Sequence, residues 1–357
     1  MKKLLSFLLL AIVLTAGCAP ARKTAVMPRS EASTRWAEAA SRFYEETRSV
    51  TAPDTAEPYS IMVVNHGKVV FEKWYNGKGP ESKFDVYSIS KTVLAMAAGC
   101  AEKEGLLKVD DRVIDYFPGQ LPAHVSDTLR SMKIRHLLTM TCGYEETPKL
   151  LSVFKGNKDF DWIKEFFVSE CKSIPGTDFY YNFFASYIMS AIIQKVTGMT
   201  VMDYIGPRIL EPLHITDLEW ENSPAGICVG GWGMLASTED LAKLGQLLLQ
   251  RGKWNGRQLV PASWIDTMTS YLVESGPVNA FTKGKDSAML SDPSNDHSQG
   301  YGYYVWQGKY GTYRMEGMLG NYVIVHPQTG TVLVVTGRSN MDQRYMDLIW
   351  RHFKQLL

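Results

Sequence analysis

The sequence has almost no excess of charge of either sign. Its 357 residues include 38 Lys and Arg and 37 Asp and Glu, for a formal net charge of +1. A balance this close to zero, with no basic stripe, gives no electrostatic basis for binding nucleic acid. The composition, 45% hydrophobic and 21% charged, is that of a globular protein. It excludes a wholly disordered chain, a collagen and a coiled coil.

Cysteine is scarce, and the spacings typical of metal and phosphate sites are missing. There is no CxxC pair, and the seven histidines are scattered with no HExxH sequence. We therefore expect structural or solvent-facing histidines and no metal or other cofactor. A GxSxG turn, a Walker A loop and a GxGxxG turn between a strand and a helix are also absent. An oxidising compartment would permit disulfides, but the spacing favours none of the three full pairings of Cys100, Cys142, Cys171 and Cys228.

Long apolar runs without charge are absent except for one near the N-terminus. A basic start, Met1 to Lys3, precedes the apolar run Leu4 to Leu14, which is too short to span a bilayer comfortably. The run ends in Leu-Thr-Ala-Gly-Cys18, which resembles the bacterial lipobox, whose cysteine is lipidated and becomes the mature N-terminus. Plain secretion, with cleavage near Ala19 or Ala21, is the alternative.

This N-terminal run predicts where the protein is located. We expect residues 1–17 to be a signal peptide, Cys18 to be lipidated, and residues 18–35 to be a tether. The protein would then be a lipoprotein of the bacterial cell envelope, facing the periplasm or the exterior. Its only contact with the membrane would be this lipid anchor, and its oligomeric state is left open.

The remaining chain is predicted to contain a helix, a hairpin, a long helical stretch, several strands and a closing helix. Two β-rich runs on either side of an Asn-His-Gly-Lys turn are typical of a hairpin. Ser237 before two acidic residues and an apolar run is typical of a helix start. The expected helices are 31–48, 92–104, most of 106–270, and 341–357, and the expected strands are 59–64, 69–75, 301–307, 313–316, 322–326 and 332–336. Residues 275–299 are expected to form a polar loop.

Strands at both ends of the chain predict a single antiparallel sheet. The expected fold class is α+β, an α/β sandwich with the terminal helices on one face of the sheet and a large helical insertion. We expect residues 36–105 and 271–357 to form the sheet-containing domain. Residues 106–270 would form the mainly helical domain, with the functional site at the junction.

One short segment carries a chemical pattern, Phe84-Asp-Val-Tyr-Ser88-Ile-Ser-Lys91-Thr92. A spacing of three at the start of a helix places the Ser88 hydroxyl and the Lys91 amine on one face, within reach of each other. A serine hydroxyl is a poor nucleophile unless a neighbouring base takes its proton. A lysine in a partly desolvated pocket can be neutral and serve as that base.

The same spacing has a structural explanation. Ser88 would then be a helix N-cap and Lys91 a surface side chain. Two other SxxK sequences, Ser152 to Lys155 and Ser169 to Lys172, show that chance occurrence is expected. Ser88 differs from them because it follows the predicted hairpin and directly precedes a long apolar helix.

The segment from Phe84 to Thr92 resembles the nucleophile motif of the serine β-lactamase and penicillin-binding-protein superfamily. It is nearest to the class C branch with its DD-peptidase, esterase and nylon-oligomer hydrolase relatives. The similarity covers residues 58–340 and implies a β-lactamase/transpeptidase-like fold. Further family segments follow in the same order at Ile134–Gly143, Pro175–Tyr181, Ile192–Gly198, Gly230–Asp240 and Gly252–Gly256.

The resemblance implies a role for each matched residue. Ser88 would be the acylated nucleophile and Lys91 its proton acceptor. Tyr181 would pass protons to the leaving group and activate water for deacylation, with its pKa lowered by the Lys91 charge. Without the resemblance, Tyr181 is equally an aromatic core residue. In the family motif the backbone N–H groups of Ser88 and Met318 would form the oxyanion hole.

Two departures from the family pattern bear on the substrate. The family's Tyr-x-Asn has Phe183 at its third position, with Asn182 beside it, and this argues against a dedicated β-lactamase. In the third motif Met315 stands where the family carries a cation, before Glu316 and Gly317. The following Gly-x-x-Gly-Asn321-Tyr is more like the nylon-oligomer hydrolases. Besides the catalytic residues, the candidate substrate-binding residues are therefore Asn182, Phe183, Gly317 and Asn321.

The leading hypothesis is an exported serine hydrolase that forms an acyl-enzyme on a small ester or amide. The absent cation favours an esterase or amidase over an enzyme that grips a substrate carboxylate. The alternative is a lipoprotein that keeps the fold, has little or no activity, and binds cell-wall fragments or a protein partner. Phe183 and Met315 motivate this alternative, and intact Ser88, Lys91 and Tyr181 argue against it.

Overall fold

The computed structural model describes residues 26–144, 161–275, 292, 294–341 and 343–357. The predicted signal peptide, Cys18 and the Ser152–Lys155 pair lie outside these residues, as does most of the predicted polar loop. No helix in the described ranges is both long and apolar enough to cross a membrane.

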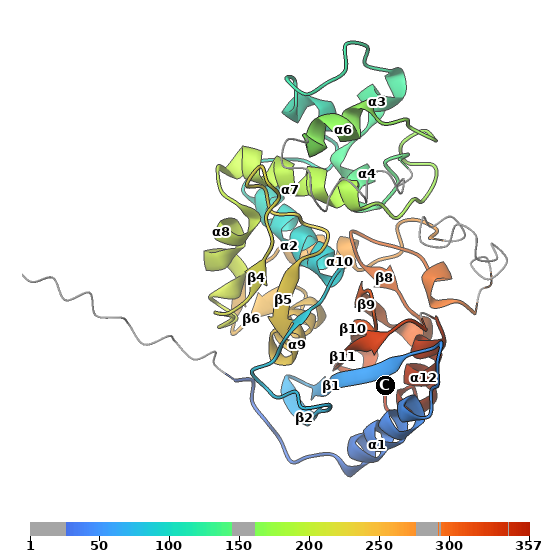
Figure 1. The fold of residues 1–357 in the computed structure, drawn as a ribbon. Coiled ribbons are helices and arrows are strands. Elements are labelled where there is room, and N and C mark those ends of the chain that lie inside the picture. The colour runs from blue at the N-terminus through green and yellow to red at the C-terminus, as the bar shows by residue number, and fades with distance from the viewer. Residues whose placement is uncertain (1–25, 145–160, 276–291, 293, 342) are drawn as a thin grey trace, which may run out of the picture.

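A six-stranded sheet is built from the two ends of the chain, as predicted. Its strand order is β2-β1-β11-β10-β9-β8, and every neighbouring pair is antiparallel. The central pair joins β1 to β11, with Ile61 opposite Val335. Figure 1 shows this pairing as a blue strand beside the red ones. The strands are β1 (Ala56–Asn65), β2 (Lys68–Trp74), β8 (Trp306–Gln307), β9 (Tyr313–Gly317), β10 (Asn321–His326) and β11 (Thr331–Ser339).

The two terminal helices cover one face of this sheet. They are α1 (Thr34–Arg48) and α12 (Gln343–Phe353), and they contact each other. Phe43 of α1 is fully buried, with its ring 5.6 Å from that of Tyr345 and 5.5 Å from that of Phe353. This layer is the smaller of two apolar cores, and it confirms the predicted α+β class with both terminal helices on one face.

Helix α9 (Thr238–Leu249) covers the opposite face of the sheet. It begins as predicted, because the Ser237 hydroxyl accepts from the Asp240 N–H while the Asp240 carboxylate accepts from the Ser237 N–H. A Cβ on Gly245 would lie 2.6 Å from Val332 and 2.7 Å from Val323, so only glycine allows this close approach. Helix α9 therefore packs on the six-stranded sheet. Its residues nevertheless fall within 106–270, the range that was predicted to form the mainly helical domain.

The remaining elements form the part of the molecule farther from the terminal helices. Its longest helices are α2 (Ile89–Lys103) and α7 (Phe183–Thr197), which contact each other within the larger core. The shorter helices are η1 (Val113–Tyr116), α3 (Asp127–Ser131), α4 (Ile134–Leu138), α6 (Trp162–Val168), α8 (Val201–Ile205), η2 (Gly206–Leu210) and α10 (Ala262–Met268). Short helical turns in the C-terminal part are η4 (Asp296–Ser298), η5 (Lys309–Gly311) and η6 (Pro327–Thr329).

Two small sheets interrupt the region that was predicted to be mostly helical. The first has strand order β3-β5-β4, from β3 (Lys83–Asp85), β5 (Met234–Ser237) and β4 (Glu219–Trp220). The second pairs β6 (Lys253–Trp254) with β7 (Arg257–Gln258). The strands have two to four residues each, too short for a period-two pattern to stand out from the neighbouring helical periodicity.

The predicted strand 301–307 is shorter than expected. Only Trp306 and Gln307 belong to β8, because Tyr304 has a left-handed backbone with φ +55° that breaks the extended run. Tyr301 instead forms isolated bridges with Val273 and Trp306. The irregular segment carries several aromatic side chains into the larger core.

Candidate active site

Ser88 stands at a strained turn between β3 and α2. Tyr87, the preceding residue, has φ +48°, a conformation that costs a non-glycine residue on the order of 1–3 kcal/mol. The Asp85 carboxylate stabilises the turn by accepting the Tyr87 N–H at 3.0 Å. The chain thus reverses abruptly from strand to helix and places Ser88 at the first turn of α2.

Lys91 is buried and hydrogen-bonded to Ser88. Its Nζ donates to the Ser88 Oγ at 2.9 Å and to the Gly231 carbonyl at 2.8 Å. The Lys91 side chain is fully buried, and the Ser88 side chain makes no helix-capping hydrogen bond. The alternative of a capping serine beside a surface lysine therefore does not describe this pair. By contrast, Lys172 of the Ser169 to Lys172 sequence is exposed and pairs with Glu170.

Two aromatic rings lie against the Lys91 amine. Its Nζ is 4.9 Å from the ring centroid of Tyr181 and 4.4 Å from that of Phe183. Ring faces attract a cation, yet they give it far less solvation than water does. The site therefore accommodates the Lys91 amine in both its charged and its neutral form. A group that accepts and returns a proton during a reaction needs both forms.

The segment before α7 brings Tyr181 to Lys91 and turns Asn182 away. Tyr181 is buried, and its ring stacks on Trp306 with centroids 5.5 Å apart. Asn182 caps α7 by accepting the Ala185 N–H at 3.1 Å, and its amide donates to the Tyr144 carbonyl at 2.8 Å. Both ends of the Asn182 side chain therefore bind the chain itself, which gives this predicted substrate-binding residue a structural role.

The end of β9 lies against the segment that leads into Ser88. A Cβ on Gly317 would come within 2.0 Å of the Val86 carbonyl oxygen, so only glycine fits there. Met318, the next residue, has a side chain that is 46% exposed. The buried Asn321 donates to the Met318 carbonyl at 2.7 Å and so supports the turn that follows β9. This packing sets Gly317 and Met318 beside the start of α2.

A buried ion cluster occupies the strand on which the family carries its cation. Glu316 accepts from Arg314 Nε at 2.6 Å through one oxygen and contacts His297 Nε2 at 2.6 Å through the other. Burial alone would raise the pKa of Glu316, but Arg314 and His297 outweigh it and lower this pKa to about 2. The sequence reasoning missed the cluster, because nothing in the local pattern connects His297 with a strand that begins 16 residues later.

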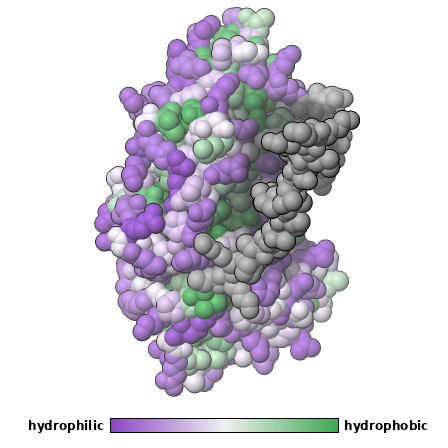
Figure 2. Space-filling view, turned by 90° about the vertical axis from the view of Figure 1, so that its left-hand side faces the viewer, coloured by the Kyte–Doolittle hydropathy of each residue, from purple (hydrophilic) through white to green (hydrophobic). Residues whose placement is uncertain are grey.

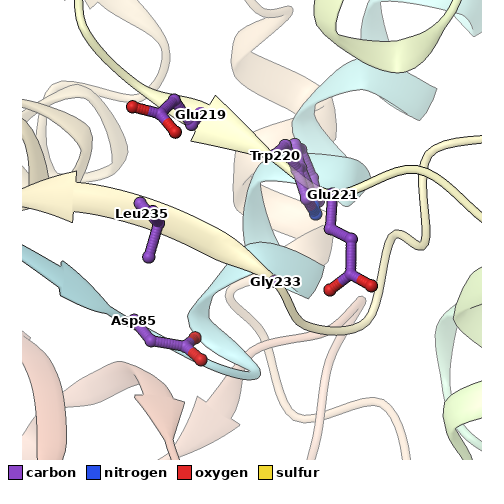
Figure 3. A pocket seen from close by; sticks show the side chains of 6 residues that line it. All are labelled: Asp85, Glu219, Trp220, Glu221, Gly233 and Leu235. Carbon is purple, nitrogen blue, oxygen red and sulfur yellow. The ribbon is translucent and has the colours of Figure 1, made fainter. Parts of the chain in front are cut away.

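A cavity of about 300 Å³ lies beside the small sheet of β3, β5 and β4. Figure 3 shows its lining residues on and beside the small sheet: Asp85, Glu219, Trp220, Glu221, Gly233 and Leu235. Burial raises the pKa of Asp85. None of the residues predicted to act in the chemistry lines this cavity, and Asp85 connects it to the turn before Ser88.

The described residues contain no other candidate reactive centre of the kinds considered in the sequence. Among the described residues no disulfide joins Cys100, Cys142, Cys171 and Cys228, and burial raises the pKa of Cys100 and of Cys228 to about 12. Within the same residues no group of three or more His, Cys, Asp or Glu side chains is arranged to hold a metal ion. Ser88 and Lys91 are thus the pair in which a side-chain nucleophile lies within hydrogen-bond reach of a potential base.

The sheet between helical layers, with a serine–lysine pair at the start of α2, defines the class of β-lactamase-fold serine hydrolases. The chain belongs to the β-lactamase family, whose model matches residues 52–352. Solved structures with this fold include penicillin-binding-protein homologues from Pyrococcus abyssi and Caulobacter crescentus. The predicted resemblance is therefore confirmed.

The proteins and solved structures similar to this chain include hydrolases. The chain is 20% identical over 243 residues to the 6-aminohexanoate-dimer hydrolase of Paenarthrobacter ureafaciens. The aligned region covers 63% of this chain and 62% of that protein. EstCE1, a hydrolase with promiscuous acyltransferase activity, superimposes with a TM-score of 0.70 at 18% identity, over 89% of this chain and 98% of that one. Protein flp of Staphylococcus aureus (strain COL) is 26% identical over 174 residues, 46% of this chain but only 35% of its own length.

Proposed function

We propose that the protein is a serine hydrolase that forms an acyl-enzyme at Ser88 on a small ester or amide. The observation that carries the proposal is the 2.9 Å hydrogen bond from the fully buried Lys91 amine to the Ser88 hydroxyl. A lysine removed from water readily loses its proton, and its neutral amine then takes the proton of the attacking hydroxyl. The same fold is found in a D-stereospecific amidohydrolase from Streptomyces and in a hydrolase with promiscuous acyltransferase activity, and both activities fit this chemistry.

The reaction proceeds in two halves. Ser88 Oγ bonds to the carbonyl carbon while Lys91 accepts its proton. The bond from that carbon to the leaving oxygen or nitrogen then breaks, and the leaving group takes up the proton of the Tyr181 hydroxyl, which becomes a phenolate. In the second half water attacks the acyl carbon, its proton passes to Tyr181, and Ser88 Oγ leaves with a proton from Lys91. Tyr181 fits this role because its ring lies 4.9 Å from the Lys91 amine.

Backbone groups stabilise the negative charge that develops on the carbonyl oxygen. We assign the oxyanion hole to the N–H groups of Ser88 and Met318, which belong to the start of α2 and to the residue after β9. The tight contact of Gly317 with Val86 supports this assignment, because it holds these two segments together. Loss of one such donor typically costs about 3–4 kcal/mol of transition-state stabilisation.

The surroundings of Lys91 favour a substrate with an uncharged, apolar acyl group. Phe183 lies on the amine, its ring is 5.8 Å from that of Trp232, and Trp232 in turn stacks near Trp162. The face seen in Figure 2 is mostly polar, with small groups of apolar residues among the polar ones. The basic groups at the third motif are Arg314 and His297, and both engage Glu316, which favours a substrate without a carboxylate.

A fluorophosphonate probe tests the proposal. The wild-type protein should be labelled at Ser88, and Ser88→Ala should lose both labelling and ester hydrolysis. Ser90→Ala is the matched control, since the Ser90 hydroxyl is buried two residues away and donates to the Gly230 carbonyl at 3.1 Å. This variant should keep its labelling. If folded wild-type protein is not labelled, or if Ser88→Ala still hydrolyses esters, the proposal is wrong.

A second candidate function is a binding lipoprotein that has lost turnover. The observation that favours it is the pair of departures at the site, Phe183 on the amine and Met315 in place of a cation. It predicts binding of cell-wall fragments or of a protein partner with no product formed. A burst of product equal to the enzyme, followed by steady turnover, would exclude it.

The location is proposed from the N-terminal sequence alone. We infer that Cys18 carries the lipid that holds the protein on the bacterial envelope, after removal of residues 1–17. Cys18→Ser should move the protein from the membrane fraction to the soluble fraction of the envelope and abolish incorporation of labelled fatty acid. Unchanged fractionation of Cys18→Ser would contradict the anchor.

A further inference from the structure

Trp306 of β8 contacts both Tyr181 and the buried ion cluster. Its ring stacks on that of Tyr181, with the centroids 5.5 Å apart and the ring planes 21° from parallel. The His297 ring meets the indole edge-on at 4.7 Å, and the guanidinium carbon of Arg314 lies 5.7 Å from the indole centroid. The indole itself is buried. One side chain thus links the cluster to the candidate proton carrier.

The strand pairing and the ion cluster fix the place of Trp306. In the pairing of β8 with β9, Trp306 lies opposite Arg314. The Arg314 guanidinium donates to the Gln307 carbonyl at 2.7 Å and to Glu316 at 2.6 Å. Glu316 also contacts His297 at 2.6 Å. These groups resist displacement, because separating them would leave a buried charge unpaired. Trp306 therefore rests on a rigid support.

Tyr181 lies outside the helices and strands, in the segment before α7. The rings of Phe183 and Tyr301 meet its ring edge-on at 6.2 and 6.3 Å. Trp306 is the nearest of these three rings and the one that is stacked on it. Aromatic rings attract each other beyond their shared burial, so the indole holds the phenol ring in one plane. The same phenol ring lies 4.9 Å from the Lys91 amine, and any tilt of its plane would move the hydroxyl relative to that amine.

We propose that Trp306 is a positioning residue that holds the Tyr181 ring, through the stacked contact, in the place from which Tyr181 transfers protons. The inference rests on the proposed function, because the placement of this ring matters to the chemistry only if Tyr181 carries protons. Proton transfer needs close geometry, and a misplacement of about 1 Å can cost about 100-fold in rate. Trp306 acts through Tyr181 and needs no contact with the substrate.

A p-nitrophenyl ester separates the two halves of the reaction. Its leaving group departs as a phenolate without taking up a proton, so acylation of Ser88 depends little on Tyr181. Deacylation needs Tyr181 to accept the proton of the attacking water. A displaced Tyr181 should therefore slow the loss of the acyl group far more than its formation. A purely structural role of Trp306 predicts no such asymmetry between the two steps.

Trp306→Leu tests the inference, with Trp264→Leu as the matched control. Both tryptophans are 4% exposed and belong to the larger core, where Trp264 Nε1 donates to the Ala95 carbonyl of α2 at 2.9 Å. Both variants should be less stable in urea, and both should label at Ser88. Only Trp306→Leu should lose about tenfold or more in kcat while its single-turnover acylation rate stays within about threefold of wild type. Its acylated Ser88 should accumulate in the intact-mass spectrum during turnover.

Trp306→Phe keeps the test decisive if the leucine variant does not fold. It retains a smaller ring over Tyr181, so its kcat should fall by only about threefold, with the acylation rate unchanged. Trp264→Phe should match wild type in both rates. If the folded Trp306 variants keep the wild-type kcat, or lose acylation and kcat by equal factors, the inference is overturned while the proposed function stands. If wild type is neither labelled nor active, both are overturned.

Discussion

Lys91 is the residue on which the candidate chemistry depends most. Its side chain is fully buried, and the Ser88 hydroxyl and the Gly231 carbonyl accept from its amine. An amine so placed is costly as a cation, which is the physical condition for a lysine that accepts a proton near neutral pH.

Replacing Lys91 by methionine should abolish reactivity while the protein stays folded. The apolar chain keeps most of the volume, and the loss of the base should slow probe labelling of Ser88 by at least about 100-fold. Lys243→Met is the control, because Lys243 is also buried and burial lowers its pKa, yet its amine binds the His214 carbonyl. Labelling rates and melting temperatures are measured for both variants. If Lys91→Met is labelled as fast as Lys243→Met, Lys91 is not the base.

Phe183 should limit reaction with β-lactams. Its ring lies 4.4 Å from the Lys91 amine, where the family carries an asparagine that holds the substrate amide. We expect Phe183→Asn to speed acylation by a chromogenic cephalosporin about tenfold, the size of one added hydrogen bond. Phe183→Leu removes the ring without adding a polar group and should give no gain. Equal rates for the two variants would show that residue 183 does not set this preference.

Strand β9 replaces a missing cation with an ion cluster supplied from several segments. Arg314 is 1% exposed, and it donates to Glu316 and to the Gln307 carbonyl. The His297 ring meets Trp306 at 4.7 Å, and Trp306 stacks on Tyr181. The cluster therefore supports the aromatic wall on which Tyr181 rests.

The cluster should make stability depend on pH through Glu316. Its pKa is about 2 when folded and about 4.3 when unfolded, so its contribution is present above about pH 4.3 and lost as the pH falls toward 2. Glu316→Gln should cost about 3 kcal/mol at pH 7, because it leaves Arg314 buried without its partner, and clearly less at pH 3. Urea unfolding at both pH values measures this. Asp266→Asn is the control. It breaks an exposed pair with Arg251 and should cost under about 1 kcal/mol. A loss of stability in Glu316→Gln that does not depend on pH would contradict the role given to Glu316.

Local patterns were enough to predict most of the long elements. The hairpin of β1 and β2, the start of α9 at Ser237, and β9 to β11 follow from alternation, turn residues and capping, all of which are local. The site was partly predictable for the same reason, since Ser88 and Lys91 share one helical turn. His297 and Trp306 were missed, because their importance comes from contacts with Glu316 and Tyr181 that only the folded chain creates.

The described residues form two apolar cores, and only one of them surrounds the helix that carries Ser88 and Lys91. One lies between the sheet and the terminal helices α1 and α12, and the other surrounds α2 and α7. The sheet lies between them, with α9 on the side of the larger core. Leu94 of α2 belongs to the larger core and packs against Gly230, which precedes the carbonyl that accepts from Lys91. Truncation in one core should therefore affect reactivity differently from truncation in the other.

Phe43→Ala and Leu94→Ala test this separation. Both side chains are fully buried, so Phe43→Ala should cost about 3–5 kcal/mol and Leu94→Ala about 2–5 kcal/mol in urea unfolding. Below the unfolding transition, Phe43→Ala should label at Ser88 as fast as wild type, because the sheet separates its cavity from α2. Leu94→Ala should label several-fold more slowly, since the cavity lets Gly230 and Gly231 shift and loosens the hydrogen bond that orients Lys91. Equal slowing in both variants would mean that the two cores act as one unit.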